Sequence, residues 1–434
     1  MSARWLWLPL LSLAGCAVTP APTPDARAQL DAIARDYVQL TLEIGEREPG
    51  YVDAYYGPPE WAAMAKANPR ALAALRAETD RLLQRVATIP VESLDGLEQR
   101  RPAFLAAQLK AAQTRLRMLQ GEKLRFADEA EGLFAWRPQL KPLADYDAAL
   151  AEVEALAPGA GPLSERVDAL LAQTAVPADK LDAVMRAAIA ECRRRTALHI
   201  ALPAAEKFEL EFVTGKPWSG YNWYQGQAHS LIQINTDFPV LMSRAVDLGC
   251  HEGYPGHHVL NLLLEQRLAR TRGWVEFYVY PLYSPESLIA EGTANFGIDL
   301  AFPGDDRLAF ERDVLYPLAG LDPALAGRDL ALTRAKARAS GARLTIAQQY
   351  LDGEIDRATA VALAQKYQLV SRERAEQSIT FTETYRSYVI NYGLGQDLAQ
   401  AHVEAAGTDA AARWAAMEKV LSEPTLPSDL ASKQ

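Results

Sequence analysis

The eight residues from His251 to His258 read His-Glu-Gly-Tyr-Pro-Gly-His-His and hold three of the six histidines in the chain. Imidazole nitrogens are zinc ligands, and a glutamate directly after a ligand histidine can take a proton from water on the metal. In the common helical arrangement, H-E-x-x-H, the second histidine lies four positions after the first, on the same face. Here that position is Pro255. The segment therefore predicts a site for Zn²⁺, with His251 as a ligand, Glu252 as the general base and an insertion between the histidines.

Two geometries are open for the second histidine ligand. Proline removes a backbone donor and crowds the preceding turn, and glycine relieves the strain. If Pro255-Gly256 bulges out of the helix, His257 moves to the metal; if the helix stays regular, His258 returns to the face of His251, about 10 Å along the axis. We favour His257, because a local bulge keeps the site compact. His258 is then expected to be a catalytic group beside the metal, as an orienting or oxyanion-binding residue.

A hydrolytic zinc needs a third protein ligand, and Glu291 is the best candidate. Ser284 and Pro285 form a typical helix start, which places Glu291 about two turns into that helix. Gly292 and the small residues after it allow close packing against another helix. A carboxylate buried there needs a reason, and a metal is one. The alternative is a surface carboxylate on an amphipathic helix.

This motif, followed downstream by Glu-Gly-Thr-Ala at residues 291–294, resembles the bacterial family called domain of unknown function 885. That family is grouped with the gluzincin metallopeptidases, in which two helix histidines and a downstream glutamate bind zinc. The resemblance covers residues 206–395 well and the N-terminal half loosely. It implies a large helical gluzincin-like domain and a zinc-dependent hydrolase. Dipeptidyl peptidase III, another gluzincin group, accommodates an extra residue between its motif histidines through a helix bulge.

A strand pattern at residues 229–235 precedes the motif helix and suits a peptide substrate. In gluzincins an edge strand at this place pairs with the extended substrate, so the resemblance makes Ile234 and Asn235 substrate-binding candidates. A purely structural hairpin is the alternative.

Two tyrosines near the C-terminus, Tyr388 and Tyr392, are four positions apart and share a helix face. A tyrosine hydroxyl can donate a hydrogen bond to the oxyanion of a tetrahedral intermediate, so both are catalytic candidates. Arg386 could hold a carboxylate terminus as a substrate-binding residue. Core packing of the tyrosine pair is the alternative.

The N-terminus has the composition of an export signal. Arg4 precedes an apolar run at residues 5–14, which is too short to span a bilayer as a helix and leads through Gly15 to Cys16. These residues resemble the lipobox of bacterial lipoproteins. The resemblance implies a signal peptide at residues 1–15, lipidation of Cys16 and a proline-rich tether at residues 16–25. Ala17 after the cysteine favours the outer membrane, so we expect a lipid-anchored envelope protein facing the periplasm. An ordinary secretory peptide is the alternative.

The body of the chain has an ordinary globular composition, with 49% hydrophobic and 23% charged residues. The net charge of −10, with no basic cluster beyond Arg193-Arg194-Arg195, argues against a nucleic-acid partner. Helical spacing dominates, and strand patterns occur only between residues 206 and 235. We therefore predict a mainly α fold, with an N-terminal helical region at 26–205 and a zincin-like catalytic region at 206–434. A small antiparallel sheet should lie next to the active-site helix.

Cys192 and Cys250 could pair only if the fold brings them together, and two buried thiols are the preferred interpretation. Together these features predict a zinc metallopeptidase of the cell envelope with a peptide or peptide-like substrate. A cell-wall amidase and a non-enzymatic periplasmic binding or assembly lipoprotein are the alternatives. A binding protein would have no need of Glu252, since only catalysis requires a carboxylate there.

Overall fold

The computed structural model describes residues 25–431. The predicted signal peptide, Cys16 and the tether up to residue 24 lie outside the described residues. The described part is mainly helical, which confirms the predicted fold class. No helix in this part combines the length and the apolar character that crossing a membrane requires.

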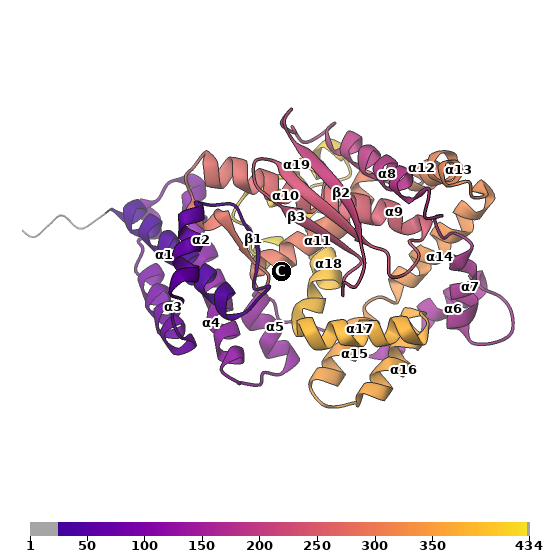
Figure 1. The fold of residues 1–434 in the computed structure, drawn as a ribbon, viewed down its shortest axis with the longest axis horizontal. Helices are drawn as coiled ribbons and strands as arrows, with labels where there is room; N and C mark the ends of the chain where they lie inside the picture. The colour runs from indigo at the N-terminus through magenta and orange to yellow at the C-terminus, as the bar shows by residue number, and fades with distance from the viewer. Residues whose placement is uncertain (1–24, 432–434) are drawn as a thin grey trace, which may run out of the picture.

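Helices build the N-terminal part, at the left of Figure 1. They are α1 (Ala26–Arg47), α2 (Pro59–Ala67), α3 (Leu72–Ala87), α4 (Arg101–Leu119) and α5 (Phe126–Phe134). Asp25 caps α1 by accepting a hydrogen bond from the backbone N–H of Ala28. Leu30, Ile33 and Tyr37 recur at helical spacing and are buried, so this face of α1 packs against α3 and α4.

Three strands form the sheet at the top of Figure 1, in the order β2 (Lys207–Val213), β4 (His229–Asn235), β3 (Gly220–Tyr224). The sheet is mixed, because β4 is antiparallel to β3, as expected, but parallel to β2. β4 lies in the centre of the sheet, where both of its edges are paired. It is also the most buried of the three strands. The expectation that β4 is an edge strand is wrong, and the edge strands are β2 and β3.

A second, two-stranded sheet joins distant parts of the chain. β1 (Val52–Tyr55) pairs with β5 (Val279–Pro281) in antiparallel orientation. The hydrophobic cores are shared in the same way: one combines α1 and α3–α5 with residues near 283 and 388. The predicted regions 26–205 and 206–434 therefore contribute to common cores.

The sheet shares a hydrophobic core with a group of helices that surrounds the motif. These are α8 (Leu181–Thr196), α9 (Met242–Leu248), α10 (His257–Leu264), α11 (Pro285–Ala301), α18 (Ile390–Glu404) and α19 (Ala410–Ser422). At the lower and right edges of Figure 1 lie α6 (Asp147–Leu156), α7 (Leu163–Ala172), α14 (Ala326–Arg338), α15 (Ala342–Leu351), α16 (Arg357–Gln368) and α17 (Arg372–Tyr385). Short helices complete the fold: α12 (Asp306–Phe310), α13 (Tyr316–Ala319) and α20 (Pro427–Leu430).

Candidate metal centre

The motif helix is interrupted between its histidines. α9 continues into a π-helical turn at Gly249–Gly253, and the chain then leaves the helix at the cis peptide bond between Tyr254 and Pro255. Gly256 follows the π turn so closely that a Cβ atom there would lie 1.8 Å from the carbonyl oxygen of His251. The insertion therefore does more than bulge: it separates two helices, and only glycine fits at its end.

His257 is the first residue of the new helix, α10, and this restart places its ring beside that of His251. The centroids of the two rings are 4.7 Å apart, and the ring planes are perpendicular. Nε2 of His251 lies 3.2 Å, and Nε2 of His257 3.8 Å, from Oε2 of Glu291 on α11. The structure thus brings together the three residues predicted as metal ligands.

The three donor atoms fit a zinc ion. Ligands at about 2.0–2.1 Å from a tetrahedral metal are about 3.3 Å from one another. The two distances from Glu291 are close to this value, and all three donor atoms lie within 4.8 Å of one another. Oε2 of Glu291 is buried and accepts no hydrogen bond from any residue between 25 and 431, although it faces both imidazoles. A buried carboxylate oxygen without a partner is costly, and a cation between the three atoms would satisfy it.

Neighbouring groups hold two of these ligands through their other polar atoms. Nδ1 of His251 lies 3.0 Å from Oδ1 of Asn295, and the Asn295 amide in turn donates to the carbonyl of Tyr392. The hydroxyl of Tyr388 donates to Oε1 of Glu291 at 2.8 Å. Such outer contacts orient metal ligands and fix the histidine tautomer.

Glu291 and the tyrosines meet because α11 and α18 approach closely. A Cβ atom at Gly292 would lie 2.3 Å from the backbone of Gly395, so the contact requires glycine. This is the close helix packing expected at Gly292. It sets the carboxylate of Glu291 against the phenol of Tyr388, which lies just before α18.

Glu252 is buried beside the candidate ligands, and no side chain in the described part of the protein forms a hydrogen bond with its carboxylate. Its backbone carbonyl accepts a hydrogen bond from Asn222 on β3, which fixes the residue relative to the sheet. Its Oε1 lies over Gly220, where a Cβ atom would come within 2.7 Å of it. Burial raises the pKa of Glu252 to about 7, although the nearby His251 acts to lower it. A carboxyl of this kind can both accept and release a proton near neutral pH.

A cavity of about 1490 Å³ runs along this group. His251, Glu252, His257, Glu291 and Tyr392 all lie in its wall. Typical small-molecule sites are roughly 300–1,000 Å³, so this cavity has room for a longer substrate.

The predicted catalytic role of His258 is wrong. Its ring is fully buried, with Nδ1 2.8 Å from Oγ of Ser230 and Nε2 3.2 Å from Oε2 of Glu206. The order serine, histidine, glutamate resembles a nucleophile with its base, but none of the three lines the cavity. Because α10 begins at His257, the next side chain points to the opposite side, into the core under the sheet.

The predicted substrate-binding residues are also placed differently. Ile234 is fully buried in the central strand. Asn235 lies in the cavity wall, but its amide donates to the carbonyls of Lys216 and Trp218 and holds that loop. Arg386 is paired with Glu129 at 2.7 Å and does not line the cavity, so its predicted role as a carboxylate anchor is wrong.

The two tyrosines have different positions. The hydroxyl of Tyr388 is committed to Glu291, so Tyr388 supports a ligand and has no free proton to donate to an oxyanion. Tyr392 lies in the cavity wall, and no described residue accepts a hydrogen bond from its hydroxyl. Tyr392 therefore remains the candidate for the oxyanion role.

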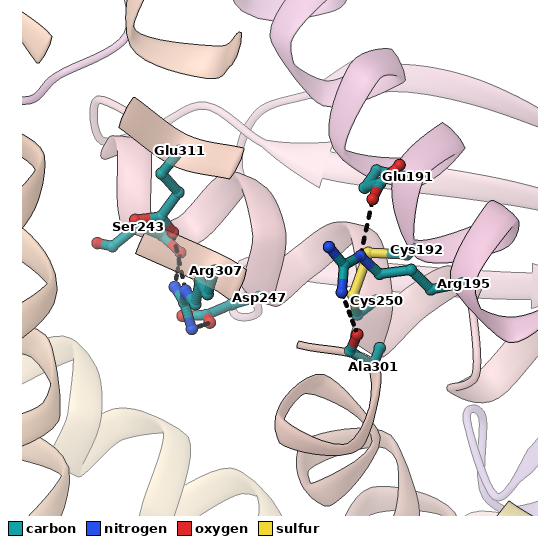
Figure 2. Close-up of a disulfide and its surroundings, with 9 residues drawn as sticks. All are labelled: Glu191, Cys192, Arg195, Ser243, Asp247, Cys250, Ala301, Arg307 and Glu311. Carbon is teal, nitrogen blue, oxygen red and sulfur yellow. Dashed lines mark hydrogen bonds and ion pairs between the residues drawn. A yellow bond between two sulfur atoms is a disulfide. The ribbon is translucent and has the colours of Figure 1, made fainter. Parts of the chain in front are cut away.

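Cys192 and Cys250 form a disulfide, which corrects the expectation of two buried thiols. Figure 2 shows this bond between α8 and the π-helical turn, with Cα atoms 5.3 Å apart. Close to it, Arg195 of α8 donates to the carbonyl of Ala301 at the end of α11. Cys250 directly precedes His251, so the disulfide fixes the segment that presents this histidine.

Several site residues were not predicted from the sequence. Asp53 on β1 lies in the cavity wall and accepts a hydrogen bond from Tyr221 on β3. Burial raises the pKa of Asp53 to about 7. The position of Asn295 could have been predicted, because it follows Glu291 by one helical turn and therefore lies on the same face of the helix. The position of Asp53 could not have been predicted, because it is the pairing of β1 with β5 that brings this residue to the site.

No protein-family model matches the chain, and no curated protein matches it. Membership of the family called domain of unknown function 885 therefore stays a prediction. Among solved structures, a presumed lipoprotein from Colwellia psychrerythraea is similar over 81% of this chain and 69% of that chain, with 15% identity and a TM-score of 0.49. An M32 carboxypeptidase from Deinococcus radiodurans R1 is similar over 91% of this chain and 88% of that chain, with 13% identity and a TM-score of 0.35. Both likenesses are distant, so the site itself carries the case for function.

Proposed function

We propose that this protein is a zinc-dependent hydrolase, most simply a peptidase. The observation that carries the proposal is the convergence of His251 Nε2, His257 Nε2 and Glu291 Oε2 in a cavity wall, with Glu252 beside them. Two imidazoles and one carboxylate form a donor set that suits zinc, and three protein ligands leave a position open.

Zinc held by these residues would supply Lewis acidity, which activates water and polarises a carbonyl group. Glu252 is the base in this proposal: its free carboxyl faces the cavity, accepts a proton beside the ligands and releases it to a leaving amine. Tyr392 can donate a hydrogen bond from its hydroxyl to a developing oxyanion. Tyr388 and Asn295 keep Glu291 and His251 in place.

A peptide is the proposed substrate, and strand β3 supports it. β3 is an edge strand of the three-stranded sheet, and its residues Gly220 to Trp223 line the cavity. An edge strand presents backbone groups that can pair with an extended peptide. The substrate-pairing strand in this proposal is therefore β3 in place of β4.

The proposed location is the cell envelope, with a lipid anchor at Cys16. The disulfide supports it, since such bonds persist in oxidising compartments such as the periplasm. Cys16→Ser should leave the precursor unprocessed and without lipid, because both steps need the sulfur. Radiolabelled lipid incorporated normally into this variant would contradict the anchor.

Zinc content and peptide hydrolysis across a set of variants test the proposed function. Glu252→Gln should keep its zinc while turnover falls about a hundredfold or more, the range of a lost general base. His251→Ala and Glu291→Ala should lose zinc and activity together, and His258→Ala should keep zinc. Full activity in Glu252→Gln would refute the mechanism. Hydrolysis of cell-wall fragments without hydrolysis of peptides would instead favour the amidase alternative.

A further inference from the structure

Arg343 lies in the cavity wall and has no anionic partner among residues 25–431. It lies in the first turn of α15, and its guanidinium makes no hydrogen bond or ion pair with any described residue. Its Nε is buried without an acceptor. The guanidinium instead lies 5.1 Å from the ring centre of Phe381 and 5.8 Å from that of Tyr392. Aromatic rings stabilise a cation but do not satisfy its N–H donors.

Three other arginines of this cavity wall are paired with acids. Arg115 pairs with Glu48, and Arg244 and Arg307 both pair with Asp247. Burial lowers the pKa of Arg343, and Tyr392 is the charged or ionisable neighbour that opposes this effect. An arginine nevertheless stays protonated, so an unpaired positive charge is kept in this wall at a cost in stability.

The position of Arg343 relates it to the metal centre. Tyr392, whose ring neighbours Arg343, is also 5.9 Å from the ring of Tyr388, which holds Glu291. The tyrosine rings therefore separate the guanidinium from the ligands. A group bound to Arg343 and a carbonyl at the metal centre could belong to one extended substrate.

We infer that Arg343 binds a carboxylate group of the substrate. A guanidinium and a carboxylate match in shape and form two parallel hydrogen bonds. A single guanidinium suits a monoanion better than a phosphate group, which carries close to two negative charges. This inference rests on the proposed function and deepens it: the simplest substrate is a peptide whose free C-terminal carboxylate lies near the bond that is cut.

Calorimetric titration of the Glu252→Gln protein, which should not consume its ligand, tests the carboxylate site. The probes are N-acetyl-trialanine, its C-terminal amide, and N-acetyl-Ala-Glu-Ala amide. The free acid should bind at least about tenfold more tightly than its amide, as expected for a charge-assisted pair. Adding Arg343→Gln should abolish this preference, and Arg343→Lys, which keeps the charge without the planar fork, should retain part of it.

Arg374→Gln is the matched control, because Arg374 lines the same cavity and also lies over an aromatic ring, that of Phe238, but has Asp168 as a charged neighbour. It should keep the preference for the free acid. Equal binding of acid and amide to the parent, or a preference that survives Arg343→Gln, would overturn the inference. Arg343-dependent binding of the glutamate peptide amide alone would assign the carboxylate to a side chain of the substrate.

The results that would refute the proposed function differ from those that would refute the carboxylate site. If the wild-type protein lacks zinc and hydrolyses no peptide while acid binding by the Glu252→Gln protein still depends on Arg343, the carboxylate site stands and the hydrolase does not. Thermal unfolding of Arg343→Gln, which should be at least as stable as the parent because an unpaired charge is removed, excludes misfolding as the cause of lost binding.

Discussion

The hydroxyl of Tyr388 donates a 2.8 Å hydrogen bond to Oε1 of Glu291 and leaves Oε2 facing His251 and His257. This bond selects which carboxylate oxygen is available to a metal. Tyr388→Phe should therefore weaken zinc binding by about ten- to a hundredfold, the usual effect of losing a contact that orients a ligand.

Competition with a chelator of known affinity measures this change. Tyr385→Phe is the control, because Tyr385 lines the same cavity but makes no hydrogen bond to Glu291. An unchanged zinc affinity in Tyr388→Phe would show that α11 alone orients the carboxylate.

Gly220 on β3 leaves the space that the carboxylate of Glu252 occupies. A Cβ atom there would lie 2.7 Å from Oε1 of Glu252 and 2.7 Å from Cδ2 of Leu248. Both are ends of flexible side chains, so Gly220→Ala should fold and bind zinc but displace the base. We expect turnover to fall by about tenfold or more, which is part of the roughly 100- to 10,000-fold that a general base contributes.

Steady-state kinetics beside zinc analysis checks this expectation. Gly253→Ala, one residue after Glu252, is the control, since its Cβ would make only ordinary contacts at 3.7 Å and 3.9 Å. Wild-type turnover in Gly220→Ala would mean that the position of the Glu252 carboxylate does not limit the reaction.

The disulfide between Cys192 and Cys250 closes a loop with a sequence separation of 58. A loop of this size predicts a loss of about 4 kcal/mol in the free energy of unfolding when both cysteines are replaced by alanine. Denaturant unfolding with and without reductant measures it. The wild-type protein should lose stability in reductant, whereas the double variant should be insensitive to it. Equal stability of all forms would show that the bond adds nothing to the native state.

The buried carboxylate of Glu206 should make the free energy of unfolding decrease at acid pH. Burial acts to raise its pKa, but hydrogen bonds from His258, Tyr254 and Arg193 outweigh this and lower it from 4.5 to about 2. A group whose pKa is lower in the folded state stabilises the protein above its unfolded pKa. That stabilisation, on the order of 1–3 kcal/mol since Arg193 is partly exposed, is lost as the pH falls from about 4.5 towards 2.

Unfolding free energies measured between pH 3 and pH 6 test this, and Glu206→Gln should show a weaker dependence on pH than the wild type. Glu209→Gln is the control, because the Glu209 side chain is exposed. The same slope in wild type and Glu206→Gln would assign the acid sensitivity to other carboxyls.

The residues of the candidate metal centre could be predicted from the sequence because each is marked by its immediate neighbours in the chain. The adjacent His251 and Glu252, the proline that forbids a regular helix and the helix start before Glu291 each involve a few neighbouring residues. The mainly α class and the three strands near residue 220 follow from hydrophobic periodicity, which is local as well. The choice of His257 for the position beside His251 rested on the same local argument about Pro255-Gly256.

Contacts between distant segments were decided only by the tertiary structure. The sequence singles out Arg386 as a carboxylate anchor and gives no sign of Arg343, but packing places Glu129 beside Arg386 and, among the described residues, no acid in an ion pair with Arg343. The central place of β4 and the pairing of Cys192 with Cys250 depend in the same way on how strands and helices pack. The pattern of residues in a helix or strand determines which of its faces is apolar. Which other element packs against that face depends on the packing of the whole chain.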